Sequence, residues 1–206
     1  MSTGTLYIIS APSGAGKTTL VDAVVNRVPD VAVSVSHTTR ALRGGEVDGV
    51  DYHFINEVEY HRMVTGGEFL EHARVFDHHY GTSRQHIQEQ LLKGVDVILD
   101  IDWQGARQIR ELVPDCHSIF LLPPSVESLR ERLTGRGQDS AEVIERRMQR
   151  AVSEMSHFGE FDSLVINDDL EQAIEDISSI FICKRQELDY QRQKHADLLA
   201  NLLSEQ

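Results

Sequence analysis

Cysteine is scarce in this 206-residue chain, and the only two, Cys116 and Cys183, lie 67 positions apart. That spacing fits neither a disulfide-rich scaffold nor a metal-binding cysteine motif. Long apolar runs are also missing, because no stretch approaches the roughly 18 consecutive apolar residues of a membrane-spanning helix. No basic segment precedes the short apolar stretch Leu6–Ile9, so no signal peptide is predicted. We therefore expect a cytoplasmic chain with reduced thiols and no membrane partner.

Basic residues are in the minority as well: 20 Lys and Arg stand against 33 Asp and Glu, a net charge of −13. Proteins that bind nucleic acid or anionic lipid without sequence preference need a positive field, so neither partner is expected. The basic residues are 16 Arg and only 4 Lys, and the planar guanidinium suits bidentate phosphate contacts. Only residues 1–43 and 130–150 carry net positive charge, +2 each, which favours anionic ligands there.

Short apolar runs alternate with helical patterns and no repeat is visible, which is typical of an α/β fold with a largely parallel sheet. The predicted core strands are Leu6–Ser10, Val31–Ser36, Val95–Asp100, His117–Leu122 and Ser163–Ile166. Helices are predicted over Lys17–Arg27, Glu57–Thr65, Ser83–Lys93, Gln104–Leu112, Val126–Leu133 and Glu142–Phe158, with a long one from Leu170 to about Leu203. Two stretches depart from this alternation of strands and helices. Residues 37–82 predict a small antiparallel insert, and the arginine-rich residues 130–150 a second sub-domain on the core.

The turn between the first strand and the first helix is a variant of the Walker A phosphate loop. Its residues are Ala11, Pro12, Ser13, Gly14, Ala15, Gly16, Lys17 and Thr18. Ala11 stands where the strict pattern has glycine, which matters only if that position needs a positive φ. The backbone amides and the helix dipole would face an anion, Lys17 would reach the β- and γ-phosphates, and Thr18 would ligate Mg²⁺. A glycine-rich turn with an exposed lysine is the alternative, and the strand-to-helix placement disfavours it.

Two further groups of arginines help to choose among P-loop proteins. A GTPase would carry Asn-Lys-x-Asp after a late strand, whereas Asn167 is followed by two aspartates. Arg40 and Arg43 lie three apart behind hydroxyl residues, and we expect both to be free of acidic partners and to suit a second phosphate. A third group comprises Arg132, Arg136, Arg146, Arg147 and Arg150. Moving a phosphoryl group between two bound phosphates requires cations that contact the donor, the acceptor and the phosphoryl group being transferred.

Six ordered motifs resemble guanylate kinase of the bacterial type: SAPSGAGKT, SVSHTTRALRGGEVDGVDYHF, FLEHARV, YGTS, VILDIDWQG and LPPSVESLRERLTGRG. The resemblance covers roughly residues 5–185. It implies a single domain over 1–206 with a three-layer P-loop NTPase core and parallel sheet at 1–36, 89–124 and 151–206. It also implies an inserted GMP-binding sub-domain at 37–88 and a helical lid at 125–150. The implied reaction is transfer of the γ-phosphoryl group of MgATP to GMP, giving ADP and GDP in purine nucleotide metabolism.

The resemblance also implies roles for individual residues. The GMP phosphate would be held by Ser36, Arg40, Arg43, Tyr52 and Tyr80, and the guanine read by Glu71, Thr82 and Asp102. ATP would contact the phosphate loop, the lid arginines Arg132, Arg136 and Arg147, and Asn167 near the adenine. The catalytic cations would be Lys17, Arg40, Arg43, Arg132, Arg136 and Arg147.

The chemistry of the bases agrees with these implied roles. Guanine presents N1–H and N2–H₂ donors on one edge, so the Glu71 carboxylate can accept from both, and adenine offers no such pair. We expect Asp100 and Asp102 to point to opposite sides at the end of their strand. Asp100 would then hold Mg²⁺ through water, beside Thr18, while Asp102 faced the acceptor base. The GMP phosphate is already ionised, so no general base is needed.

Other interpretations stay open. The chain could be a non-catalytic guanylate-kinase-like module that binds proteins, or a P-loop kinase for another acceptor. No dedicated metal site is expected among the loop residues His72, Asp77, His78 and His79, because they lack ligand spacing. Trp103 is expected to pack rather than to stack on a base. The acidic C-terminal helix is expected to pack on the core, and its apolar end Leu198–Leu203 leaves a homo-oligomer possible.

Overall fold

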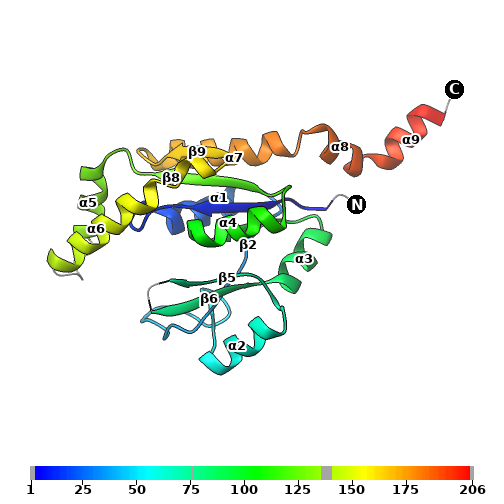
Figure 1. Ribbon diagram of the computed structural model, residues 1–206. Coiled ribbons are helices and arrows are strands. Elements are labelled where there is room, and N and C mark those ends of the chain that lie inside the picture. The colour runs from blue at the N-terminus through cyan, green and yellow to red at the C-terminus, as the bar shows by residue number, and fades with distance from the viewer. Residues whose placement is uncertain (1–2, 76, 136–140, 205–206) are drawn as a thin grey trace.

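A five-stranded, fully parallel sheet forms the centre of the protein, in the order β2-β7-β1-β8-β9. The computed structural model describes residues 3–75, 77–135 and 141–204. The strands are β1 (Leu6–Ser10), β2 (Val31–Val33), β7 (Asp96–Asp100), β8 (His117–Leu122) and β9 (Ser163–Ile166). Because each parallel connection must cross over, helices cover the two faces (Figure 1). The predicted α/β fold with a parallel sheet is confirmed.

The helices pack on alternating residues of the strands. Tyr7 and Ile9 of β1 share one core cluster with α1 (Lys17–Arg27) and α7 (Leu170–Lys184). Leu6 and Ile8 share the other with α3 (Arg84–Leu92) and α4 (Trp103–Leu112). All five residues of β1 are buried, as a central strand covered on both faces requires.

The strand after α1 is shorter than predicted. We expected Val31–Ser36, but β2 ends at Val33. Ser34 still donates its N–H to the carbonyl of Ile98, after which the chain leaves the core sheet. It enters a second sheet at once, because β3 begins at His37.

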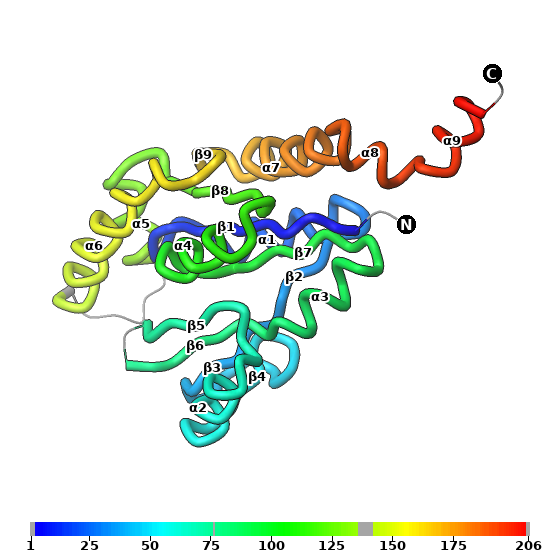
Figure 2. The backbone as a smooth tube through the Cα atoms, turned by 45° about the vertical axis from the view of Figure 1, so that its right-hand side comes forward, coloured from blue at the N-terminus to red at the C-terminus, as the bar shows by residue number. Residues whose placement is uncertain are grey.

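The second sheet has four strands in the order β4-β3-β6-β5, and in Figures 1 and 2 it lies below the core. Its elements are β3 (His37–Thr38), β4 (His53–Phe54), α2 (Glu57–Thr65), β5 (Phe69–Val75) and β6 (His78–Ser83). The expectation of a purely antiparallel insert is wrong for one pair, because β3 and β4 run parallel. A small apolar cluster of Tyr60, Met63 and Phe69 holds α2 against the sheet.

Two helices stand where β1 ends, α5 (Val126–Thr134) and α6 (Ala141–Met155) (Figure 2). They enclose a core of their own, made by Leu129, Leu133, Met148 and Ala151. α6 ends before the predicted Phe158, which instead begins the short 3₁₀ helix η1 (Phe158–Glu160). α5 packs on the phosphate loop, because Leu133 leaves no room for a side chain at Gly14.

The single long C-terminal helix that we predicted is three helices: α7, α8 (Leu188–Lys194) and α9 (Ala196–Ser204). Arg185 ends α7 by reaching back to the sheet, where its guanidinium binds the Asp96 carboxylate at 2.9 Å and the carbonyl of Pro29 at 2.8 Å. The side-chain amide of Gln191 donates a hydrogen bond to the carbonyl of Arg185, at the end of the helix. Figure 1 shows α8 and α9 leading away from the core. Among the described helices, none combines the length and apolarity needed to cross a membrane.

Candidate functional site

The turn Ala11–Thr18 joins β1 to α1 with the backbone that a phosphate loop needs. Gly14 and Gly16 have φ values of +93° and +91°, which side-chain-bearing residues rarely adopt. Ala11 is not among the described residues with positive φ, so alanine in place of the pattern's glycine costs no strain. No side chain caps α1 at Gly16, so its first N–H groups are left for an anion.

Two side chains from distant parts of the chain support this loop. The Ala15 carbonyl accepts hydrogen bonds from the Asn167 amide at 2.8 Å and the Arg132 guanidinium at 3.2 Å. Arg132 also donates to the carbonyl of Asn167 at 2.8 Å. A Cβ at Gly16 would lie 2.8 Å from the same amide. Arg132 and Asn167, both predicted ATP contacts, thus hold the loop's backbone in this structure.

Helix α6 contacts the loop through Ser13. Arg147 donates to the Ser13 hydroxyl at 3.0 Å, and the Ser13 N–H donates to the Glu154 carboxylate at 2.9 Å. Burial raises the pKa of Glu154 above its ordinary value. Sequence reasoning missed Glu154, whose only sequence signal is its place on the arginine-rich helix. The predicted Arg136 lies outside the described residues.

Lys17 belongs to the loop itself and lines the cavity beside it. Its ammonium forms an ion pair with the Asp100 carboxylate and donates to the carbonyl of Ile101 at 3.2 Å. Lys17 and Asp100 are partly exposed, at 21% and 27% of their side chains, so both are accessible to a ligand. Thr18 follows directly at the start of α1.

The expectation that Asp100 and Asp102 face opposite sides is wrong. Residues two apart on a strand share a face, and β7 ends at Asp100 in any case. Asp102 instead caps α4, accepting the N–H groups of Gln104 at 3.1 Å and Gly105 at 3.0 Å. Both carboxylates line the same cavity.

Glu71 on β5 is a carboxylate buried to 4% exposure. It accepts a hydrogen bond from the Thr82 hydroxyl at 2.5 Å, and Ser36 Oγ lies 3.4 Å from that hydroxyl. Gly105 makes room for it, because a Cβ there would lie 2.9 Å from Glu71 Oε2. Burial, aided by the charge of Asp102, raises the pKa of Glu71 to about 7, although the Thr82 hydrogen bond opposes the shift.

Arg40 is 7% exposed and has an acidic partner, contrary to expectation. Its guanidinium binds both carboxylate oxygens of Glu46, at 2.7 and 3.0 Å, and the Arg43 N–H donates to Glu46 at 2.8 Å. The Arg40 hydrogen bond holds the pKa of Glu46 below its ordinary value. The Tyr52 ring lies 5.4 Å from the guanidinium. Glu46 follows Arg43 by three residues, so sequence spacing could have revealed it.

Two cavities bring these groups together. One of about 360 Å³ is lined by the phosphate loop and by Ser36, Tyr52, Glu71, Tyr80, Asp100, Asp102 and Glu154, among others. The other, of about 480 Å³, contains Arg40, Arg43 and Glu46. They share Thr18, Ser36, Tyr52, Tyr80 and Asp100. The phosphate loop, the paired arginines and the buried carboxylate therefore open onto adjoining spaces, although Thr18 and Glu71 lie 53 positions apart in the sequence.

Trp103 packs against protein, as expected. Its indole stacks on the His157 ring at 3.7 Å with an interplanar angle of 8°, and the Arg107 guanidinium lies 5.0 Å from it.

Known proteins similar to this chain share one description. A family profile described as guanylate kinase matches residues 3–183, so the match ends within α7. The guanylate kinase of Alkalilimnicola ehrlichii is 56% identical over 200 residues, covering 97% of this chain and 98% of that protein. The guanylate kinase of Photorhabdus laumondii is 54% identical over 207 residues and covers 100% of both. The crystal structure of guanylate kinase from Anaplasma phagocytophilum matches with a TM-score of 0.75 at 34% identity, covering 91% of this chain and 89% of that one.

Proposed function

The chain belongs to the guanylate kinase family, and from this premise we propose how its residues divide the work of the reaction. Guanylate kinases are ATP:GMP phosphotransferases, and this enzyme transfers the γ-phosphoryl group of ATP to GMP, giving ADP and GDP. One observation carries the assignments below. The phosphate loop and the buried Glu71 line a single cavity, and the paired arginines line its neighbour.

ATP binds at the phosphate loop in this proposal. The N–H groups from Ala15 to Thr18 surround the β-phosphate, and Lys17 exchanges Asp100 for phosphate oxygens. Arg132, Arg136 and Arg147 act from the lid. The hydrogen bonds of Arg132 to backbone carbonyls support a second duty for it, holding the loop in shape before ATP arrives.

Mg²⁺ is the cation that we propose accompanies ATP, and the donors beside Lys17 fit it. The Thr18 hydroxyl and the Asp100 carboxylate line both cavities, and Mg²⁺ prefers oxygen ligands completed by water. Thr18 would hold the ion directly and Asp100 through a water. When bound, Mg²⁺ neutralises charge on the phosphates.

The GMP phosphate is held by Ser36, Arg40, Arg43, Tyr52 and Tyr80. Arg40 presents its two nitrogens to the two oxygens of Glu46, the same fork that a phosphate accepts. GMP binding therefore replaces one anion by another at a guanidinium that is already oriented.

The guanine is read by Glu71, with Thr82 and Asp102. The ionised Glu71 carboxylate accepts from N1–H and N2–H₂ of guanine, and Thr82 fixes its orientation. An adenine in this place would leave the carboxylate buried without donors, a costly arrangement. One oxygen of Asp102 caps α4 and the other accepts from the Gln104 side-chain amide at 3.2 Å, so the base would replace that amide at the second oxygen.

Catalysis then needs positioning and charge neutralisation and no general base, because the attacking GMP oxygen is already ionised. Residues 37–88 form the GMP-binding insert, 125–150 the lid, and 1–36, 89–124 and 151–206 the core. Lid closure brings the two phosphates together and excludes water, so that ATP is protected from hydrolysis.

A coupled assay of ADP release with MgATP and each of GMP, dGMP, AMP, CMP and UMP tests this proposal. GMP should be the strongly preferred acceptor. No ADP with any acceptor would favour a protein-binding module, and preference for a different acceptor would overturn the role given to Glu71.

We also propose a cytoplasmic location, which suits two free cysteines, and self-association through α9. Its leucines Leu198, Leu199, Leu202 and Leu203 are 38–74% exposed and lie on adjacent turns. The same face on a second copy would cover them symmetrically. Light scattering should give a higher mass for the wild type than for Leu198→Glu/Leu202→Glu, and equal masses would contradict this.

A further inference from the structure

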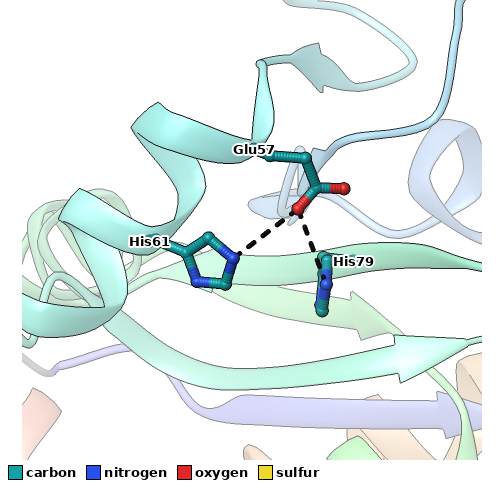
Figure 3. A group of neighbouring side chains, drawn as sticks. All are labelled: Glu57, His61 and His79. Atoms are coloured by element: carbon teal, nitrogen blue, oxygen red, sulfur yellow. Dashed lines mark ion pairs between the residues drawn. The ribbon is translucent and has the colours of Figure 1, made fainter.

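Two imidazoles and a carboxylate meet on the insert, away from the nucleotide cavities. Glu57 and His61 lie one turn apart on α2, and His79 comes from β6. Figure 3 shows both imidazoles directed at the same oxygen of Glu57, at 3.7 Å for His61 Nε2 and 3.6 Å for His79 Nε2. One ligand atom from each residue lies within 4.8 Å of the other two.

One donor of this group is anchored and two can adjust. The backbone N–H of His79 donates to Thr39 Oγ1 at 3.0 Å, and the imidazole ring stacks on Tyr60 at a centroid distance of 4.6 Å. Glu57 and His61 are exposed, at 56% and 66% of their side chains. Their i, i+4 spacing keeps both on the face of α2 that meets β6.

We propose that Glu57, His61 and His79 bind one zinc ion or a similar divalent transition metal. Imidazole nitrogens with one carboxylate suit zinc, whereas Mg²⁺ prefers oxygen donors only. Ligand atoms at about 2.0–2.1 Å around a tetrahedral ion lie roughly 3.3 Å apart. The two contacts of Glu57 are a few tenths of an ångström longer than that, and the two imidazole ligand atoms lie within 4.8 Å of each other, so rotations of the exposed Glu57 and His61 side chains would close the site. Water completes the coordination.

The site is distinct from the one that serves phosphoryl transfer. None of its three residues lines either nucleotide cavity. His79 is, however, followed directly by Tyr80, which lines both. A bound metal would therefore tie α2 to β6 and stiffen the strand that carries part of the proposed phosphate grip. Of the histidines considered from sequence, only His79 belongs to this cluster.

Calorimetric titration of the full-length, nucleotide-free enzyme with ZnCl₂ tests the proposal. One equivalent should bind, and His61→Ala and Glu57→Gln should each weaken binding at least tenfold, because even outer-shell substitutions cost about 10–100-fold in metal affinity. His78→Ala is the matched control: it removes an imidazole from the same strand and should leave the affinity unchanged. Zinc should also raise the Tm of the wild type and of His78→Ala more than that of His61→Ala.

Since His61 is mostly exposed, its substitution should leave the fold intact, which circular dichroism can verify. Equal zinc affinity in the wild type, His61→Ala and Glu57→Gln would overturn the proposal by locating the ion at other surface histidines. Absence of binding to the wild type would overturn it as well.

Discussion

Replacing Glu71 by glutamine distinguishes the effect of a buried carboxylate on the stability of the fold from its role in binding GMP. The side chain is 4% exposed and its pKa is raised to about 7, mainly by burial. Glutamine keeps the shape and the oxygen that Thr82 binds, but it carries no charge at any pH. The substitution should therefore stabilise the ligand-free fold at high pH while it damages GMP recognition.

The size of the stability effect follows from the two pKa values. An ordinary glutamate has a pKa of 4.5 and Glu71 about 7 in the folded state, and each unit of difference is worth about 1.4 kcal/mol. Between these values the folded state binds more protons than the unfolded state, so the free energy of unfolding falls as pH rises. The wild type should lose about 3 kcal/mol in this way, and Glu71→Gln should not.

Urea unfolding at pH 5 and pH 8 without nucleotide measures this difference. The stability of Glu71→Gln minus that of the wild type should grow by about 2.5 kcal/mol over this pH range, an effect of roughly 5–10 °C in Tm. In the wild type kcat/KM for GMP should rise with pH through about 7, because only the ionised form accepts both guanine donors. Glu71→Gln should lower kcat/KM for GMP about 10²-fold, as expected for losing charged hydrogen bonds.

Glu89→Gln is the matched control, since Glu89 is exposed on α3. It should show neither the pH-dependent gain in stability nor the kinetic loss. A stability difference for Glu71→Gln that is the same at pH 5 and pH 8 would refute the buried-charge reasoning. An unchanged preference for GMP over AMP would refute its role in reading guanine.

Three more predictions concern the phosphate sites. Lys17→Ala and Arg40→Ala should each lower kcat/KM about 10²-fold or more, and near wild-type turnover in either would contradict the role given to that residue. Gly16→Ala should raise the KM for ATP, because a methyl group there would lie 2.8 Å from the Asn167 amide that supports the loop. Gly45→Ala is its control: Gly45 has a similar positive φ but open space around it, so this substitution should change stability only. Glu46→Gln weakens the competitor for Arg40, so inorganic phosphate should inhibit the variant more strongly than the wild type; equal inhibition constants would count against the exchange of anions.

The parts of the fold that local pattern determines were predictable from the sequence. β1, the phosphate loop and α1 follow from an apolar run, a glycine-rich turn and an amphipathic helix, and all lie where expected. The break after α7 was not predictable, because it depends on Arg185 reaching Asp96, 89 positions earlier. Helical periodicity alone continues through that point.

The candidate site also combines features that the sequence shows with features that depend on tertiary packing. The loop and the arginines were visible as motifs, and Glu46, three residues after Arg43, could have been recognised from its spacing as a partner of Arg40. The elevated pKa of Glu71 arises from packing between β5 and α4, and no spacing in the sequence signals it. The lesson from Asp100 and Asp102 is geometric: residues two apart share a face of a strand, so the pleat never placed them on opposite sides, and Asp102 lies beyond the end of β7, where it caps α4.

The support of the Ala15 carbonyl has a consequence for the order of folding. Its hydrogen-bond donors, Arg132 and Asn167, come 117 and 152 positions later in the chain. During synthesis the loop emerges from the ribosome long before either partner exists, and closing such long segments is the slow part of forming a parallel sheet. The loop therefore gains its full support only after Asn167 has been made, although its own residues are made much earlier. A nascent chain that ends before β9 has the complete phosphate-binding motif but not yet the backbone that holds a phosphate.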